Sequence, residues 1–416
     1  MNRSLAPKIH RVQNIAWTLP TTFEVGKYCT LFYLEDENMD TCKIDFSFYL
    51  NKSNLNILNV LSFKLLTSGN NSISATKIKE EFDYLGAYVD IQVYTEVAEI
   101  SIYVLKQNLI KSIDVLFKNL QTVSFPRDEF DIALNEKKSS FQINSKKISS
   151  IARKEYQQRI FWNTPLAKTT ALEDFKQISV DDIRRTFQKD ILESLFQVSL
   201  VGSVKRIELN HILGTIEPWQ RNKSMSFHGC EKNEKGEFFF AKDDALQSAI
   251  RIGNLCMNKR HPDYIEFSIL NTFLGDYFGS RLMKNIREDK GYTYGIGSMV
   301  QHLRNVSYFT IATQVAKKHR ESTLIEIKKE IDILQNDRIS EKELTLVGNY
   351  LTGQSLKAAD GSFAQMSLFL NAKANGLEMS FYNDYLQSLN SISPKRMQDL
   401  AQIYLSWDSF SVITVG

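Results

Sequence analysis

The sequence predicts an α+β protein of two duplicated domains, each a mainly antiparallel sheet with helices packed chiefly on one face. Three observations predict this class: the chain length, a repeat between the two halves, and the order of strand-type and helix-type segments. With 416 residues, the chain is too long for one ordinary hydrophobic core and suits two domains of about 200 residues each. An apolar share of 43% and a charged share of 24% are ordinary for a globular protein.

The repeat is clearest at the end of each half. Ser179 and Ser393 lie 214 residues apart, and the same spacing separates the apolar strand-type segments 196–202 and 410–416. Both serines are suited to cap a helix that leads into the strand, and Pro394 suits the first helical position. A constant spacing between two pairs of like elements indicates a duplication.

The front of each half follows a common order as well. Strands are expected at 43–50 and 248–253, apolar helices at 55–66 and 264–274, and short amphipathic helices ending at Gly86 and Gly291. Glycine at such an end can adopt the left-handed conformation of a helix C-cap. The polar stretch 220–236 is the expected linker between domains at 1–219 and 237–416.

Composition excludes several classes of protein. The net charge of +3 comes from 51 basic and 48 acidic residues mixed along the chain, which argues against a nucleic-acid partner. The four cysteines are scattered without a Cys-x-x-Cys pair, as expected for reduced thiols. No segment approaches the roughly 18 apolar residues that span a bilayer, and the N-terminus lacks a signal-type apolar stretch. We therefore expect a cytoplasmic protein with no membrane partner.

The usual catalytic constellations are absent from the sequence. It contains no Gly-x-Ser-x-Gly elbow, no phosphate-binding P-loop and no complete dinucleotide glycine pattern. None of the six histidines has another within five residues, so no histidine pair on one helix is available to bind zinc.

One segment does carry a signature. Residues 274–296 read Leu-Gly-Asp-Tyr-Phe-Gly-Ser-Arg-Leu-Met-Lys-Asn-Ile-Arg-Glu-Asp-Lys-Gly-Tyr-Thr-Tyr-Gly-Ile. This segment resembles the C-terminal-domain signature of the insulinase/pitrilysin family, which includes the mitochondrial processing peptidase. Family members share a glycine-containing turn before Ser-Arg-Leu, a helix ending in Ile-Arg-Glu, and a glycine before a tyrosine-bearing strand. The duplicated α+β architecture extends the resemblance over nearly the whole chain.

The resemblance implies a zinc site that this chain has lost. Active members carry His-x-x-Glu-His on a helix of the first domain, where the histidines bind zinc and the glutamate activates water. With Gly69 as anchor, Val60 and Lys64 replace the histidines and Phe63 replaces the glutamate. The family's third ligand would fall near Ser140.

Neither the third ligand nor a histidine is available in that region. No acidic residue occurs between Lys137 and Lys154, and no histidine occurs between His10 and His211. The sequence therefore predicts a degenerate motif and no cofactor in this chain. Zinc is expected in a partner subunit instead.

The second domain retains two residues that the resemblance marks as functional. Active members place an arginine and a tyrosine, seven positions apart, against the zinc site of another domain or subunit. Arg287 and Tyr294 have that spacing, with Arg287 expected in the last turn of a helix and Tyr294 on the following strand. A guanidinium can bind a substrate carbonyl, and a phenol can donate to the oxyanion of a tetrahedral intermediate. Both are expected to act in trans.

These features imply the non-catalytic subunit of a two-chain zinc metallopeptidase, inactive without its zinc-bearing partner. Such a chain would form half of a chamber around an unfolded peptide, which the family binds as an added strand on a sheet edge. Two alternatives remain: a structural scaffold, and a stand-alone peptide binder with no role in proteolysis. The chain could also pair with itself when alone. It has only Gly275 and Gly279 where the family's non-catalytic processing subunit has a glycine-rich loop, so that loop is not expected to be conserved here.

Overall fold

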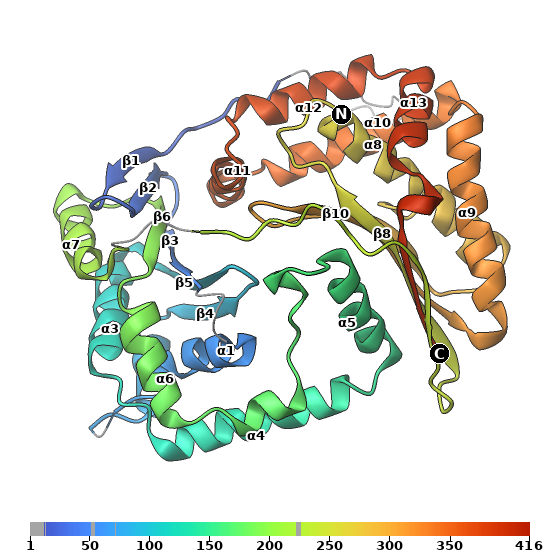
Figure 1. Cartoon of the computed structure of the whole chain (residues 1–416). Coiled ribbons are helices and arrows are strands. Elements are labelled where there is room, and N and C mark those ends of the chain that lie inside the picture. The colour runs from blue at the N-terminus through green and yellow to red at the C-terminus, as the bar shows by residue number, and fades with distance from the viewer. Residues whose placement is uncertain (1–11, 13, 51–54, 71, 222–225) are drawn as a thin grey trace, which may run out of the picture.

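The structure is a computed structural model that describes residues 12, 14–50, 55–70, 72–221 and 226–416. Two mixed sheets lie on opposite sides of the molecule, and helices surround them (Figure 1). None of the helices in the described part of the chain combines the length and the apolar character that a bilayer crossing requires.

The first sheet has the strand order β1-β2-β6-β3-β5-β4. Its strands are β1 (Thr21–Glu24), β2 (Thr30–Glu35), β3 (Thr41–Tyr49), β4 (Tyr88–Val93), β5 (Val97–Leu105) and β6 (Leu195–Gly202). The second sheet has the order β7-β11-β8-β10-β9. Its strands are β7 (Gly236–Phe240), β8 (Gln247–Cys256), β9 (Ile296–His302), β10 (Ser307–Ala316) and β11 (Ser411–Val415).

The two sheets repeat one another. Among the strands that the structure describes, only the β2–β6 and β7–β11 pairs are parallel, and β6 and β11 take the same place in their sheets. This equivalence confirms the duplication that the spacing of 214 residues predicts. Ser179 and Ser393 cap their helices by accepting from Asp182 N (3.3 Å) and Arg396 N (3.2 Å), and Gly86 and Gly291 have φ of 62° and 65°, all as predicted.

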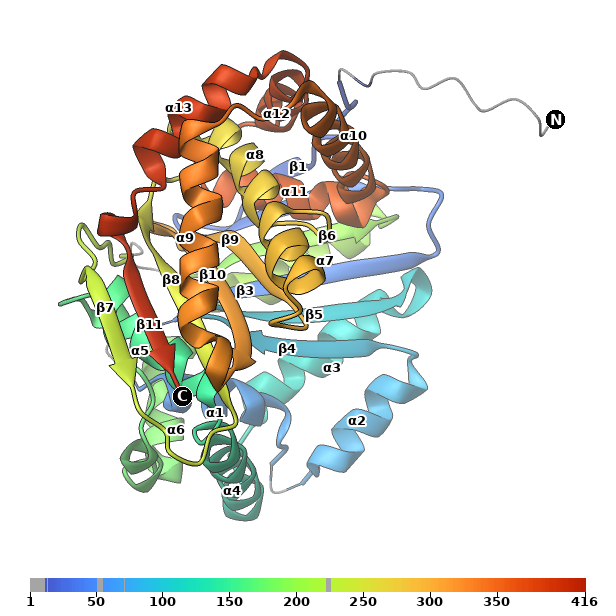
Figure 2. The same ribbon diagram turned by 90° about the vertical axis from the view of Figure 1, so that its right-hand side faces the viewer.

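Most helices cover the outer faces of the sheets, as predicted. The first half has α1 (Asn56–Lys64), α2 (Ala75–Tyr84), α3 (Leu109–Thr122), α4 (Arg127–Asn144), α6 (Val180–Thr186) and α7 (Arg206–Ile216). The second half has α8 (Tyr264–Leu274), α9 (Arg320–Asn336), α10 (Glu341–Ala358), α12 (Ser380–Ser391) and α13 (Pro394–Tyr404). Figure 2 shows α8 and α9 lying over the outer face of the second sheet.

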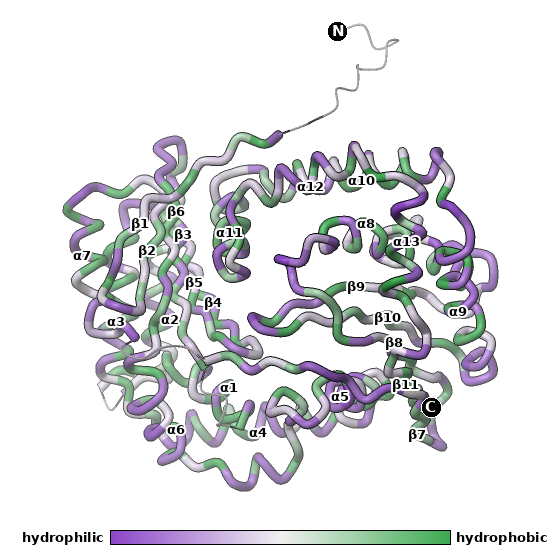
Figure 3. The backbone as a smooth tube through the Cα atoms, turned by 45° about the horizontal axis from the view of Figure 1, so that its top comes forward, coloured by the Kyte–Doolittle hydropathy of each residue, from purple (hydrophilic) through white to green (hydrophobic). Residues whose placement is uncertain are grey.

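Two further helices are exchanged between the halves. Helix α5 (Ile148–Ile160) packs on β8 and β11 of the second sheet, and α11 (Ser362–Ala374) packs on β6 of the first (Figure 3). Tyr156 of α5 donates its hydroxyl hydrogen to Phe309 O at 2.7 Å. Phe369 of α11 packs edge-on against Phe32 of β2, with ring centroids 5.1 Å apart. Each inner face is therefore covered in part by a helix from the opposite half.

The division at 1–219, 220–236 and 237–416 follows the repeat and remains a proposal, because packing crosses it. Ile15 N donates to Asn383 Oδ1 at 2.9 Å, which ties the start of the described chain to α12. Residues 222–225 of the expected linker lie outside the described residues, and β7 already begins at Gly236.

The contact of α5 with the second sheet requires glycine at position 253. A Cβ there would lie 1.9 Å from Phe309 O and 2.4 Å from the hydroxyl oxygen of Tyr156. We expect Gly253→Ala to lower the free energy of unfolding by about 3 kcal/mol in urea denaturation, because a backbone oxygen cannot move aside. Gly214 of α7 is the control position, because a Cβ there would have nothing within 4 Å. Gly214→Ala should therefore raise the free energy of unfolding by about 0.5–1 kcal/mol. Equal effects of the two substitutions would contradict this packing.

Candidate functional site

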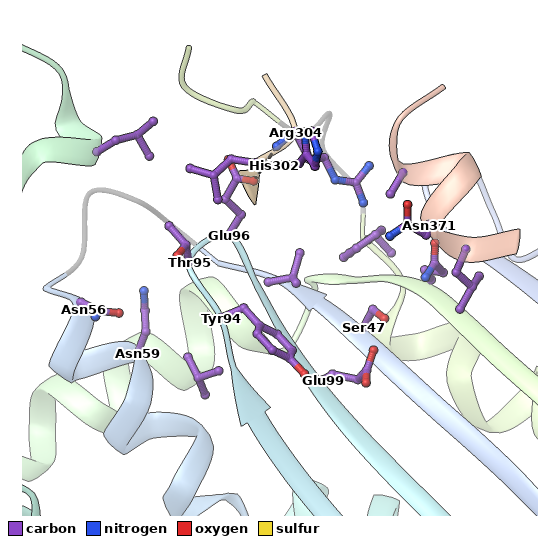
Figure 4. Close-up of a pocket in the computed structure, with 18 of the residues that line it drawn as sticks. Ser47, Asn56, Asn59, Tyr94, Thr95, Glu96, Glu99, His302, Arg304 and Asn371 are labelled. Carbon is purple, nitrogen blue, oxygen red and sulfur yellow. Dashed lines mark hydrogen bonds between the residues drawn. The ribbon is translucent and has the colours of Figure 1, made fainter. Parts of the chain in front are cut away.

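A cavity of about 870 Å³ lies between the two halves. One wall comes from β3, β5 and the start of α1, and the other from residues 302–304 of the second half and from α11 (Figure 4). The exchanged helix α11 thus closes a space that neither sheet would enclose alone.

The floor of this cavity is the polar inner face of the first sheet. Side chains alternate along β3: Phe46 packs on Phe117 of α3 with ring centroids 5.1 Å apart, whereas Asp45 lines the cavity. Asp45 accepts hydrogen bonds from Ser101 Oγ (2.7 Å) and Ser199 Oγ (2.8 Å), and Lys43 Nζ lies 2.9 Å from its carboxylate. The buried carboxylate is therefore fully matched by donors from three strands.

Two glutamates of the first half also line the cavity. Burial, and then the charge of Asp45, raise the pKa of Glu99 above its usual value. Glu96 is 6% exposed, and its Oε2 accepts from Arg304 N of the second half at 3.0 Å. Its Oε1 has no hydrogen-bond partner in the part of the chain that the structure describes. Figure 4 shows Glu96 beside His302 and Arg304.

The opposite wall carries a lysine and a histidine with lowered pKa values. Lys259 Nζ donates to Asn371 Oδ1 of α11 at 2.7 Å, and burial lowers the pKa of Lys259 to about 8. His302 forms hydrogen bonds through Nδ1 with Ser307 Oγ (2.7 Å) and through Nε2 with the Tyr264 hydroxyl (2.9 Å). Burial, and then the charge of Lys259, lower the pKa of His302 to about 4. The ring is consequently neutral at pH 7.

The three predicted positions of the degenerate zinc motif have different surroundings on α1. Phe63 is fully buried in the core, with its ring 5.6 Å from that of Phe48. Val60 is half-buried. Lys64 is exposed and forms an ion pair with Glu136 of α4, one helical turn before Ser140, and this lysine holds the pKa of Glu136 below its usual value. Glu136 is the acidic residue closest in sequence to Ser140, the predicted third-ligand position, and its carboxylate is paired with the ammonium group of Lys64.

The turn of α1 that precedes Val60 forms part of the cavity wall. Asn56 and Asn59 line the cavity, as Figure 4 shows, and with Val60 they have the same i, i+3, i+4 spacing as His-x-x-Glu-His. A shift of one helical turn from the predicted register therefore puts the motif's spacing on the cavity wall. Neither register supplies a histidine or a glutamate, and no group of three potential metal ligands occurs among the described residues. The side chains present do not fit a zinc ion.

Arg287 lies in the last turn of a helix, as expected from the sequence, and this segment, Met283–Asp289, is π-helical. Lys290 N donates to Asn285 O at 2.9 Å, five residues back, which widens the turn. Asn285 Nδ2 in turn donates to Glu330 Oε1 of α9 at 2.6 Å and anchors the segment. The guanidinium carbon of Arg287 lies 4.5 Å from the centre of the Phe278 ring.

Tyr294 lies on a bend before β9, not on the strand as expected. Thr293 fixes this bend, because its hydroxyl donates to Gln314 O (2.7 Å) and accepts from Gly295 N (3.1 Å). The side chain of Tyr294 is 96% exposed. It lines a separate pocket of about 340 Å³ beside α5, and neither Arg287 nor Tyr294 lines the larger cavity.

Sequence reasoning missed the polar residues of the cavity. Asp45, Glu96, Glu99, Lys259 and His302 come from segments far apart in the chain. A signal was present at Lys43, Asp45 and Ser47, where polar residues alternate with apolar ones on a strand that the core also needs. That alternation indicates a solvated sheet face, but not what lies opposite it.

The purified chain is expected to hold no stoichiometric zinc, because neither register of α1 presents a ligand pair. Metal analysis by atomic emission after dialysis would check this expectation. About one zinc per chain, bound in the first half, would contradict it.

The imidazole of His302 should stay neutral down to about pH 4 in an NMR titration, with its signal assigned through His302→Gln. An unfolded histidine takes up its proton near pH 6.5, earlier than the folded ring. Folding stability should therefore fall as the pH drops from about 6.5 toward 4. A midpoint near 6.5 in the folded protein would contradict the burial of this ring.

The chain is similar to known proteins both in sequence and in fold. A family model described as "Peptidase M16 inactive domain" matches residues 177–350. A Helicobacter pylori protein named "Non-peptidase homolog YmxG" is 20% identical over 351 residues, which are 82% of this chain and 80% of the relative. The chain is also similar in structure to a peptidase M16 inactive domain from Pseudomonas fluorescens, with a TM-score of 0.84 and 19% identity over 95% of this chain and 98% of that one.

A chain of Complex III2 from Candida albicans shares the fold more distantly, with a TM-score of 0.69 and 13% identity over 97% of this chain and 96% of that one. At such identities the solved structures show the fold alone. The family model, the curated relative and the 274–296 signature agree with that fold. Residues 177–350 therefore resemble the inactive domain of the M16 (insulinase/pitrilysin) peptidases, and the whole chain has the fold of such a protein without the His-x-x-Glu-His motif.

Proposed function

We propose that the chain is the non-catalytic subunit of a two-chain insulinase-type zinc peptidase. It would form half of the peptide-binding chamber and supply Arg287 and Tyr294 in trans to a zinc-bearing partner. The observation that carries the proposal is the 96% exposure of Tyr294 on a bend fixed by Thr293. A large aromatic side chain that is almost wholly exposed contributes little to its own fold, so its hydroxyl is available to another molecule.

The surroundings of Arg287 support the same role. Its guanidinium stacks on Phe278, and none of its nitrogens takes part in an ion pair or hydrogen bond within the described part of the chain. Stacking fixes the side chain while leaving its N–H donors available. Such donors can bind a substrate carbonyl as charge develops on its oxygen.

The sheet edges support a peptide as the bound molecule. β4 and β9 each end their sheet and pair with only one strand among the described elements. An extended peptide can add to such an edge through main-chain hydrogen bonds, with its side chains in the adjoining cavity. The cytoplasm remains the proposed location.

A structural scaffold is the second candidate. It is favoured by the packing of Arg287 on Phe278 and by the shared fold with a chain of Complex III2. A stand-alone peptide binder is the third, since the cavity between the halves does not depend on a partner.

The substitution Tyr294→Phe tests the trans role, because it deletes one hydroxyl and leaves the ring. In a complex reconstituted with a zinc-bearing partner we expect kcat for peptide cleavage to fall about 10²- to 10³-fold, since a donor to the developing oxyanion is lost. The control Tyr84→Phe removes the hydroxyl of another exposed tyrosine, 91% exposed on α2, and should leave kcat unchanged.

Wild-type rates for the Tyr294→Phe complex, with normal assembly, would overturn the trans role in favour of the scaffold. Peptide binding by the chain without any effect on a partner's activity would instead favour the stand-alone binder.

A further inference from the structure

Arg251 is a partly buried cation with no counterion among the residues that the structure describes. It lies on β8, opposite Ala312 of β10 and Ile413 of β11, on the inner face that α5 covers. Within the described part of the chain, its guanidinium forms no ion pair and no hydrogen bond. Burial, and then the charge of Arg153 on α5, lower the pKa of Arg251 below its usual range. Buried charges in proteins are normally paired, so this arrangement is unfavourable without an anion.

The cation lines a small polar pocket. This pocket of about 340 Å³ also contains Ser149 of α5, Gln247 of β8, and Gln314 of β10. Hydroxyl and amide groups supply further hydrogen-bond donors around the guanidinium. None of the described residues that line the pocket is an aspartate or glutamate, so no carboxylate among them competes for the arginine.

Tyr294 lines the same pocket. The arginine and the exposed phenol therefore border one space, although Arg251 lies on β8, Tyr294 lies on the bend before β9, and the two are 43 positions apart in the sequence. A guanidinium presents two parallel N–H groups that match the two oxygens of a carboxylate.

We propose that this pocket binds a carboxylate of the peptide, held by Arg251 beside Tyr294. The inference rests on the proposed function, because a peptide in the chamber brings the carboxylate to the pocket. The carboxylate comes from the C-terminus of the peptide or from an acidic side chain, and the binding chemistry is the same. Carboxylate capture would make Arg251 a specificity residue that selects which peptides reach Tyr294.

Binding of fluorescein-labelled hexapeptides to the isolated chain, followed by fluorescence anisotropy, tests the proposal. The first probe contains only alanine, glycine and leucine and ends in a free carboxylate. The second is its C-terminal amide, and the third is the amide with one internal residue replaced by glutamate. We expect the wild-type chain to bind at least one carboxylate-bearing probe about 10- to 100-fold more tightly than the plain amide.

Variants then assign the effect to Arg251. Arg251→Gln should reduce binding of the preferred probe to the level of the plain amide, and Arg251→Lys should retain part of the preference, since the charge stays and the fork is lost. The control Arg338→Gln makes the same charge change at an exposed site outside the pocket and should leave binding unchanged. Relief of the repulsion from Arg153 means that Arg251→Gln should not lower the melting temperature.

The preferred probe identifies the source of the carboxylate: the first probe indicates a peptide C-terminus, and the third an acidic side chain. Equal binding of all three probes, an Arg251→Gln variant with wild-type preference, or no binding of any probe at millimolar concentration would overturn the inference. None of these results bears on the trans role of Tyr294, which is measured separately through the partner's activity.

Discussion

The two halves are held together by the exchange of α5 and α11, and the cavity and both inner sheet faces rely on it. Tyr156 on α5 reaches the backbone of β10, and Phe369 on α11 packs against β2, so each inner sheet face is covered from the opposite half. α11 also carries Asn371, the hydrogen-bond partner of Lys259 at the cavity wall. Without this exchange both sheets would expose their inner faces, and neither the cavity nor the Arg251 pocket would be enclosed.

Helix α1 contributes side chains both to the core and to the cavity wall, which explains how the fold persists without a metal site. Phe63 remains in the core of the first half, where its ring packs on Phe48, while Asn56 and Asn59 of the same helix line the cavity. The cavity-facing turn can therefore change residue type without loss of core contacts. An exposed Tyr294 in a chain without the zinc motif supports the proposal that this chain acts on a substrate held by another chain.

Local patterns allowed much of this architecture to be predicted. The spacing of 214 residues identified equivalent strands. The helices begin at the N-cap residues Ser179 and Ser393 and end before Gly86 and Gly291, as these residue types require. The exchange of α5 could not be predicted, because its contacts with β8 depend on tertiary packing rather than on helix periodicity. The bend at Tyr294 was missed for a similar reason: the hydrogen bond from Thr293 to Gln314 O of β10 joins segments 21 residues apart and outweighs the strand tendency of the segment.

The proposed function requires Tyr294 to contact a zinc-bearing partner chain. Its most direct test is photo-crosslinking in the native cells with p-benzoylphenylalanine in place of Tyr294, followed by mass spectrometry of the crosslinked product. We expect a crosslink to a chain that carries His-x-x-Glu-His, at residues near that motif, and none when the same amino acid replaces Tyr84. A stable complex with such a chain in which position 294 forms no crosslink, or crosslinks only within its own chain, would contradict it.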